Sequence, residues 1–255
     1  MGCVRMAVNQ DGFLAAAHEV IDRLVRTQRE PIAAAAGLVA QCVLGGGVVH
    51  AFGTGHSQGL VLEIAGRAGG LIPTNKLSLR DVVTYGDTPA GALDKYVERD
   101  PAIAHRIYEL APVQDGDLFV IASNSGGNGS TVEMASLVKQ RGHGLIAFTS
   151  LDHATAVASR HPSGKHLHDL ADVVIDNCGP MGDTLLPLPT GGAVCAISSI
   201  TAAMAAQMML ADAAALILAA GQTPPVYLSA NVPEGDAHNR ELEQRYEGRI
   251  RRDPS

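Results

Sequence analysis

Short apolar segments alternate with helical patterns along most of this chain, and this alternation limits the possible folds more than any other feature. The segments Val48–Phe52, Leu118–Ala122, Leu145–Thr149 and Val173–Asp176 are nearly uninterrupted apolar runs. Strands that are buried on both faces have this appearance, and helices between them form right-handed βαβ connections. We therefore predict an α/β fold, a three-layer αβα sandwich around a parallel sheet.

The remaining elements follow from apolar spacing and from the positions of Pro and Gly. Helices are predicted at residues 13–27, 31–44, 57–67, 100–111, 130–141 and 239–249, with a further extended segment at 71–75. Residues 76–99 show no clear pattern; they are either a solvated linker or a lid whose Arg80 and Asp81 touch a substrate. We expect one domain: N-terminal helices at about 11–44, a core at about 45–220 and a C-terminal arm with a helix at about 221–255.

The segment Ala193–Ala220 is long and apolar enough to raise the question of a membrane span. Ser198, Ser199, Gln207 and Asp212 interrupt it, and a lone Asp is costly in lipid. We expect a buried, alanine-rich helix. The N-terminus has no apolar run behind a basic start, so we expect a cytoplasmic protein.

Composition narrows the partners and cofactors. The net charge is -7 and aromatic residues make up 4% of the chain, with no Trp. Proteins that bind nucleic acids present basic surfaces and stacking aromatics, so nucleic acid is not an expected partner. Cys3, Cys42, Cys178 and Cys195 include no pair at the spacing of zinc or redox sites, and we expect reduced core thiols.

The loop after Leu118–Ala122 has the composition of an anion site. It comprises residues 123–131, is built of Ser, Asn, Gly and Thr, and leads into a predicted helix. Glycines let backbone N–H groups approach an anion, hydroxyls donate further hydrogen bonds, and the helix dipole favours negative charge. The alternative is a flexible turn with an ordinary helix cap.

A second loop, Gly53–Ser57, occupies the equivalent place after the first strand. A dinucleotide fingerprint needs a glycine where Gln58 stands, and neither loop ends in the Gly-Lys-Ser/Thr of a nucleotide P-loop. A hydrolase elbow also fails, because Ser123 stands where a glycine is required. These negative results narrow the ligand, because they disfavour dinucleotides, P-loop nucleotides and hydrolase substrates.

Six short motifs, taken together, are specific: Gly53–Ser57, Arg67–Gly70, Ser123–Gly126, His161–Lys165, and Ser229–Asn231 with His238-Asn239. They resemble the sugar isomerase (SIS) domain family, in its stand-alone phosphosugar-binding group related to the N-acetylmuramic acid 6-phosphate etherases. The resemblance implies a flavodoxin-like, five-stranded parallel sheet, a phosphate held by the Ser123–Thr131 loop, and a homodimer whose sites lie near the subunit interface. No cofactor is expected. The expected substrate and phosphate contacts are Gly55, Ser57, Ser123, Asn124, Ser125, Gly126, Asn128, Ser130, Thr131, His161 and Lys165.

SIS enzymes characteristically remove the C2 proton of an opened sugar phosphate, which requires a carboxylate or a histidine. Glu63 is the first candidate, since a helix after Gly53–Ser57 would carry it toward the crevice; the alternative is an exposed Glu paired with Arg67. Glu133 and Glu30 are rival bases. His56, in the first loop, would open the sugar ring or hold its O5, or else fasten the loop.

Three other residues have weaker functional readings. Lys165 would neutralise a phosphate or an enediolate oxygen, or is a surface charge. His238 would reach a neighbouring subunit's site, or is a helix cap. His161 lies close in sequence to His166 and His168, but no helical spacing with a carboxylate supports a metal site, and none is predicted.

Two functions remain open. In the first, the chain is an enzyme on a sugar 6-phosphate, an amino sugar such as N-acetylglucosamine 6-phosphate by analogy, and C2 deprotonation leads to isomerisation or to elimination at C3. In the second, it is a non-catalytic phosphosugar sensor that regulates a partner protein. A DNA-binding regulator is not expected, because only two helices precede the first strand and no basic stripe is present.

Overall fold

The computed structural model describes residues 7–94 and 96–252. Its centre is a parallel sheet of β1 (Val49–Gly53), β2 (Thr74–Leu77), β3 (Leu118–Ala122), β4 (Gly144–Thr149) and β5 (Val173–Asp176), in the order β2-β1-β3-β4-β5. The predicted α/β class and five-stranded parallel sheet are confirmed. In the register of β1 and β3, Gly53 lies opposite Ala122, so the loops after both strands start side by side.

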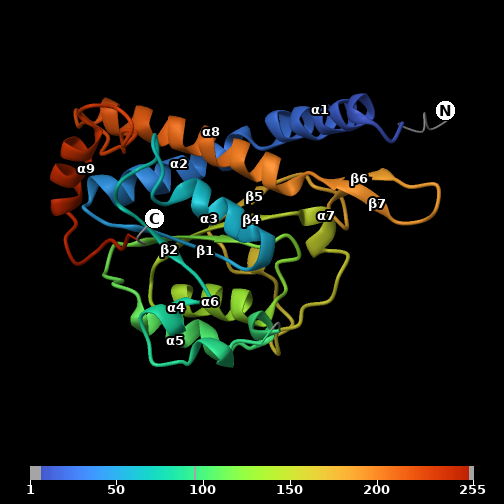
Figure 1. The fold of residues 1–255 in the computed structure, drawn as a ribbon, viewed down its shortest axis with the longest axis horizontal. Coiled ribbons are helices and arrows are strands. Elements are labelled where there is room, and N and C mark those ends of the chain that lie inside the picture. Colours follow the sequence, from blue (N-terminus) through green and yellow to red (C-terminus); the bar gives the residue numbers. More distant parts are fainter. Residues whose placement is uncertain (1–6, 95, 253–255) are drawn as a thin grey trace.

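Helices cover both faces of the sheet (Figure 1). On one face lie α1 (Gln10–Thr27), α2 (Arg29–Leu44), α3 (Gln58–Ile64) and α8 (Ser198–Ala219); on the other lie α4 (Asp81–Thr84), α5 (Ala102–Leu110) and α6 (Gly129–Gln140). Each face has its own apolar cluster, the first containing Leu24 and Ile146, and the second containing Phe119 and Met134. The carboxyl edge of the sheet is left between the two layers.

The predicted helix ends are right to within a few residues at most places. Helix α1 begins before the predicted Phe13, because the Asn9 side chain accepts a hydrogen bond from the Gly12 amide. Helix α3 ends at Ile64 rather than at Arg67, because Ala65 is extended and Gly66 has a φ of 79°. Helix α9 (Gly235–Gln244) begins earlier than predicted, so His238 lies inside it and does not cap it. Between residues 76 and 99, the described residues include the end of β2, α4 and short 3-10 turns such as Val97–Arg99.

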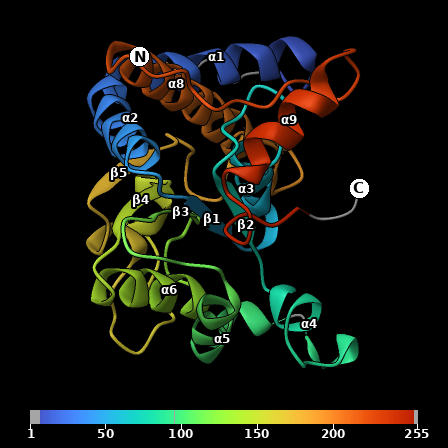
Figure 2. The same ribbon diagram turned by 90° about the vertical axis from the view of Figure 1, so that its left-hand side faces the viewer.

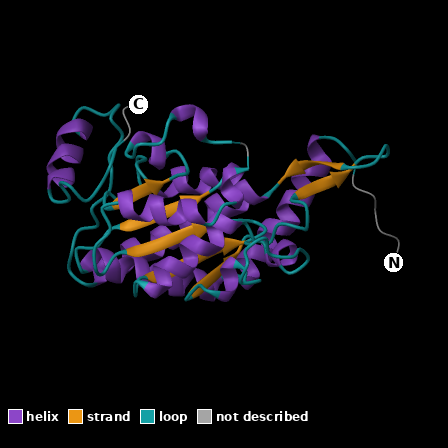
Figure 3. Ribbon diagram, turned by 90° about the horizontal axis from the view of Figure 1, so that it is seen from below, coloured by secondary structure: helices purple, strands orange, loops and turns teal. Residues whose placement is uncertain are grey.

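The segment expected to be one buried helix from Ala193 divides into a strand and a helix. Strands β6 (Thr184–Pro187) and β7 (Ala193–Ala196) form an antiparallel hairpin, which projects beyond the sheet (Figure 3). Helix α8 follows; among the described residues it alone is long and apolar enough to cross a membrane, and only 33% of its most apolar window is buried. It packs along α2 on the sheet, as a helix of a globular fold does (Figure 1).

The cysteines do not all lie in the core. Cys42 and Cys178 are buried free thiols, whereas Cys195 is exposed on the hairpin. The prediction of core thiols is therefore wrong for Cys195, because the apolar run around it forms an exposed ribbon rather than a helix. Cys3 lies outside the described residues.

The C-terminal segment returns to the sheet. The residues after helix α9 run along β2 (Figure 2). Asn75 donates to the Arg249 carbonyl oxygen at 2.7 Å and accepts from the Arg251 amide at 2.7 Å. Arg252 donates to the carbonyl oxygens of Ile72 and Thr74. These contacts cover the edge strand, which would otherwise expose unpaired backbone groups.

Candidate functional site

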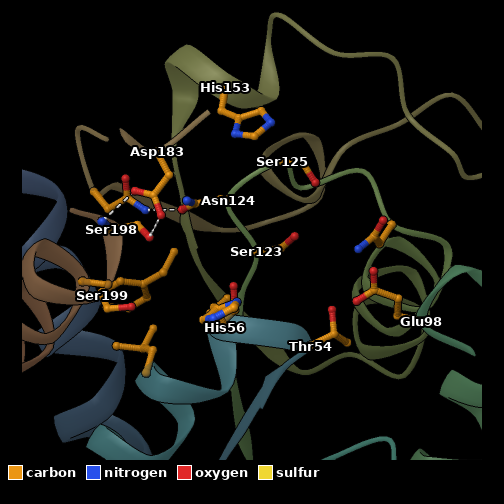
Figure 4. Close-up of a pocket in the computed structure, with 17 residues that line it drawn as sticks. Thr54, His56, Glu98, Ser123, Asn124, Ser125, His153, Asp183, Ser198 and Ser199 are labelled. Atoms are coloured by element: carbon orange, nitrogen blue, oxygen red, sulfur yellow. Dashed lines mark hydrogen bonds between the residues drawn. The ribbon is translucent and has the colours of Figure 1, made fainter. Parts of the chain in front are cut away.

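A cavity of about 220 Å³ opens at the carboxyl edge of the sheet. Its polar lining comes from several separate parts of the chain (Figure 4). These are the loop after β1 with Thr54, His56 and Ser57; the loop after β3 with Ser123, Asn124, Ser125 and Asn128; Glu98 in the segment between β2 and α5; and His153, Asn177, Asp183, Ser198 and Ser199. Ligands of parallel α/β sheets bind at this edge.

The loop after β3 carries hydroxyl and amide groups toward the N-terminus of α6. Gly126 adopts a φ of 61°, and its amide donates to Ser123 Oγ at 3.2 Å, so the loop turns tightly. Asn128 is extended (φ -70°, ψ 143°) and precedes the first residue of α6. Since the first amides of a helix have no intrahelical acceptor, this end of α6 attracts an anion.

Asn124 is fixed by its neighbours. Its side-chain oxygen accepts from Asn177 Nδ2 at 2.6 Å, and its carbonyl oxygen accepts from Thr149 Oγ1 at 3.1 Å. These bonds join the loop after β3 to the ends of β4 and β5. The polar groups of the cavity floor are thus held in place before a ligand arrives.

Asp183 joins the base of the hairpin to α8. Its carboxylate accepts from the Ser198 amide at 2.8 Å, from Ser198 Oγ at 2.6 Å and from the Ile197 amide at 3.2 Å. A carboxylate that holds the first amides of a helix has a capping role. It supplies negative charge to one end of the cavity (Figure 4).

Glu98 faces the cavity from the opposite side (Figure 4). Its carbonyl oxygen accepts from Ser130 Oγ at 2.8 Å, which ties its segment to the first turn of α6. The approach is close: a Cβ on Gly129 would lie 2.1 Å from the Arg99 carbonyl oxygen. No hydrogen bond from a described side chain or amide reaches the Glu98 carboxylate, which leaves it available as a proton acceptor.

Most of the predicted site residues lie in or next to the cavity. Six of them line it: His56, Ser57, Ser123, Asn124, Ser125 and Asn128. Gly55 and Gly126 do not line it but shape its two loops, both with positive φ. Ser130 holds Glu98, and Thr131 is fully buried with its hydroxyl unpaired among the described atoms.

The three other predicted catalytic residues lie outside the cavity lining. Glu63 accepts a hydrogen bond from Gln207 Nε2 at 2.6 Å and pairs with Arg67, as the alternative reading proposed. His238 Nε2 lies 3.0 Å from the Val226 carbonyl oxygen. Glu30 is exposed at the start of α2. None of the three is brought together with His56.

Glu133 and His161 form a separate cluster behind the loop after β3. His161 Nε2 lies 2.7 Å from Glu133 Oε2, and His105 Nε2 lies 2.6 Å from Glu133 Oε1. Burial opposes ionisation of Glu133, but the hydrogen bonds from His161 and His105 outweigh it and lower the pKa of this carboxyl below its ordinary value. Glu133 therefore joins α5, α6 and residues 159–168. Lys165 contacts this region through its backbone, accepting from Ser159 Oγ at 2.7 Å.

Comparison with known proteins identifies the family. The family model described as "SIS domain" matches residues 12–150. The chain is 38% identical over 239 residues to UPF0309 protein lmo0025 of Listeria monocytogenes serovar 1/2a, covering 93% of this chain and 97% of that protein. The chain belongs to the SIS-domain family.

Further matches extend this result to other organisms and to solved structures. A UPF0309 protein of Streptomyces avermitilis is 37% identical to this SIS-domain chain, covering 93% of it and 95% of the relative. The phosphoheptose isomerase GmhA from Neisseria gonorrhoeae has a TM-score of 0.52 at 17% identity, covering 79% of this chain and 95% of its own. A phosphoheptose isomerase from Francisella tularensis has a TM-score of 0.53 at 15% identity, covering 80% and 95%. At these identities the structural likeness establishes the fold alone.

Sequence reasoning missed several residues that line the cavity of this SIS-domain chain. Glu98 lies in the segment without a readable pattern, and Asp183 and Ser198 flank the hairpin, whose second strand was predicted as helix. The sequence contained one signal for Asp183. Gly182 and Asp183 are residues typical of turns, and they stand just before the segment Thr184–Pro187. Glu98 carried no comparable local signal.

Proposed function

We propose that this SIS-domain protein binds a sugar 6-phosphate in the cavity, with the phosphate on the loop after β3 and the N-terminus of α6. The observation that supports this most is the combination of Ser123, Ser125 and Asn128 on the cavity wall with a helix N-terminus immediately behind them. Hydroxyls, amide groups and a helix dipole together suit a phosphate. The sugar would extend from there toward Thr54 and His56.

The proposed reaction begins with removal of the C2 proton. Glu98 accepts this proton, while His56 assists ring opening by exchanging a proton at O5 or O1. The electrons of the C2–H bond form a C1–C2 double bond with an enolate oxygen at C1. In a sugar with a hydroxyl at C2, transfer of the O2 proton to O1 and return of a proton to C1 give the ketose. In an amino sugar, the enolate electrons form a C2–C3 double bond and the C3 substituent leaves with its bonding electrons, which gives the elimination product. The choice of Glu98 over Glu63 is supported by their contacts, since Glu63 is bonded to Gln207 and Arg67 outside the cavity lining.

The proposed substrate is an amino-sugar phosphate such as N-acetylglucosamine 6-phosphate, by analogy with the etherases that the sequence resembles. The cavity adds limited support. Leu60, Phe148 and Ala202 give it an apolar side that an acetyl methyl group would contact.

Deuterium exchange at C2, followed by NMR, tests the function directly. We expect exchange in D₂O with at least one of N-acetylglucosamine, glucosamine and glucose 6-phosphates. Ser125→Ala should weaken binding, because it removes one hydroxyl donor. Binding without exchange would indicate the phosphosugar sensor instead, and no binding of any of the three would refute the proposal.

We also propose that the protein is a cytoplasmic homodimer. Support comes from α8, on which Ile200 and Leu218 lie on the same face five turns apart and are 44% and 61% exposed. Exposed apolar side chains that share a helix face suit an interface. Light scattering on the parent and on Ile200→Glu with Leu218→Glu would test this; a monomeric parent would refute it.

A further inference from the structure

The cavity poses a charge problem for the proposed ligand. Among the described lining residues, the groups of fixed charge are the carboxylates of Glu98 and Asp183, and no Lys or Arg lines it. A phosphate monoester adds a charge of about -1.5 to -2 near neutral pH. Hydroxyls and amide dipoles offset part of this, but a nearby cation would offset it more effectively.

Arg160 lies immediately behind the phosphate-facing loop. Its Nη1 donates to the Asn128 side-chain oxygen at 3.0 Å, and Asn128 lines the cavity. Its backbone amide donates to the Gly127 carbonyl oxygen at 2.8 Å. Arg160 is therefore attached to the loop through both its backbone and its side chain.

The segment that carries Arg160 is held firmly against this loop. The Leu167 amide donates to the Gly126 carbonyl oxygen at 2.8 Å. A Cβ on Gly127 would lie 3.2 Å from both Ser159 Cα and His166 Cδ2, so a glycine at this position favours the close approach. Arg160 thus has a fixed backbone and an exposed, long side chain that can change rotamer.

Two other arginines near this edge are engaged elsewhere. The Arg99 guanidinium lies 4.2 Å from the centre of the Tyr96 ring. Arg23 donates to the Cys178 carbonyl oxygen and lies 3.6 Å from Asp152. The Arg160 guanidinium has one hydrogen bond to a described residue, and that partner is a neutral amide.

We propose that Arg160 supplies the positive charge that binds the phosphate, an inference that rests on the proposed function. The guanidinium turns from Asn128 to two phosphate oxygens, and the released Asn128 side chain takes part in the same site. A planar guanidinium suits this role because it donates two parallel hydrogen bonds to a phosphate. The preferred ligand is accordingly a dianionic phosphate ester rather than a monoanionic ester of the same shape.

The test compares two esters of one sugar, N-acetylglucosamine 6-phosphate and N-acetylglucosamine 6-sulfate, by calorimetry. At about pH 7.5 the phosphate is mainly a dianion, because its second pKa is about 6, and the sulfate is a monoanion. We expect Arg160→Gln to weaken phosphate binding about 10- to 100-fold and sulfate binding less. Arg160→Lys should restore part of the loss. Arg141→Gln is the matched control, since Arg141 follows the opposite end of α6.

Two outcomes would overturn the role of Arg160 while leaving the proposed function intact. The first is unchanged phosphate affinity in Arg160→Gln. The second is an equal loss of affinity for both esters in Arg160→Gln, reproduced by Asn128→Ala and not relieved in Arg160→Lys. This pattern would show that Arg160 only positions Asn128. Failure of the parent to bind either ester or any other sugar phosphate would instead refute the proposed function itself.

Discussion

His50 Nε2 lies 3.0 Å from Asp117 Oδ2, and neither side chain is exposed to solvent. The other Asp117 oxygen accepts from Arg249 Nη2 at 2.6 Å and from the Val48 amide at 2.9 Å. Burial opposes ionisation of Asp117, but the hydrogen bonds from His50, Gln114 and Val48 outweigh it and lower its pKa. Burial likewise lowers the pKa of His50 and outweighs the attraction of Asp117. The pair joins β1, β3 and the C-terminal segment.

Asp117→Asn should destabilise the protein strongly. The substitution leaves the Arg249 guanidinium without a counter-charge and disturbs the bond to His50, and loss of one partner of a buried pair costs about 3–5 kcal/mol. Urea unfolding measures the change. Asp87→Asn is the control: Asp87 pairs with Arg106 but is 97% exposed, and such a pair contributes about 0–1 kcal/mol. Equal effects of the two substitutions would contradict the assigned importance of the buried network.

The same network predicts loss of stability in acid. The pKa of His50 is lower in the folded state, so below about pH 6.5 the unfolded chain binds a proton that the folded chain does not. The neutral, buried His50 therefore contributes its full share of the folding stability above that pH, and this share declines as the pH falls. Asp117, whose pKa is also lowered, adds a further loss from about pH 4 downward. Urea midpoints between about pH 5 and 8 should show the first decline, and His50→Gln should flatten it.

The parallel sheet could be predicted because its strands are buried on both faces, which leaves a direct mark on the sequence. Leu118–Ala122 and Val173–Asp176 have the predicted bounds, and both are flanked by turn residues. The hairpin of β6 and β7 could not be predicted in the same way. Its strand Ala193–Ala196 is short, partly exposed and continuous in composition with α8, so an apolar run gave no sign of the break.

The candidate site was only partly predictable for a related reason. Ser123 and Ser125 follow a strand directly, so their place at the sheet edge is a local property. Glu98 reaches the cavity because its carbonyl oxygen accepts from Ser130 and the neighbouring Arg99 packs against Gly129, both of which lie far along the chain. Glu63 was predicted as the base because its helix follows a strand and its loop. Successive side chains of a helix point in different directions, however, and the Glu63 side chain on α3 points toward Gln207 on α8.

Glu98→Gln and Glu63→Gln should separate the two candidate bases. If Glu98 accepts the C2 proton, its replacement lowers the rate of C2 exchange by about 10²- to 10⁴-fold, while Glu63→Gln preserves most of the rate. Both variants retain side-chain shape, and sugar-phosphate binding checks that the cavity is intact. The reverse pattern, with exchange lost only in Glu63→Gln, would restore the assignment made from sequence.

Gly129→Ala should disturb the position of Glu98 without touching the cavity lining. The added Cβ would meet the Arg99 carbonyl oxygen at 2.1 Å, so α6 and residues 97–101 must separate. Such overpacking costs about 1–3 kcal/mol, and we expect weaker sugar-phosphate binding as well. Gly59→Ala is the matched control, because nothing lies within 4 Å of its added Cβ in α3. That control should be neutral or more stable by about 0.5–1 kcal/mol; similar losses in both variants would count against the specific contact.

Thr131→Val should stabilise the protein and leave ligand affinity unchanged. Thr131 is fully buried in the first turn of α6, and its hydroxyl has no hydrogen-bond partner among the described atoms. Removing an unsatisfied buried hydroxyl while keeping the side-chain shape relieves up to about 1–3 kcal/mol, or roughly 2–4 °C per kcal/mol in a chain of this size. Thr149→Val is the control, since Thr149 is equally buried but donates to the Asn124 carbonyl oxygen at 3.1 Å, and its loss should destabilise. Differential scanning fluorimetry and calorimetry measure both effects. A fall in sugar-phosphate affinity in Thr131→Val would mean that this hydroxyl turns to the phosphate on binding, as the sequence predicted.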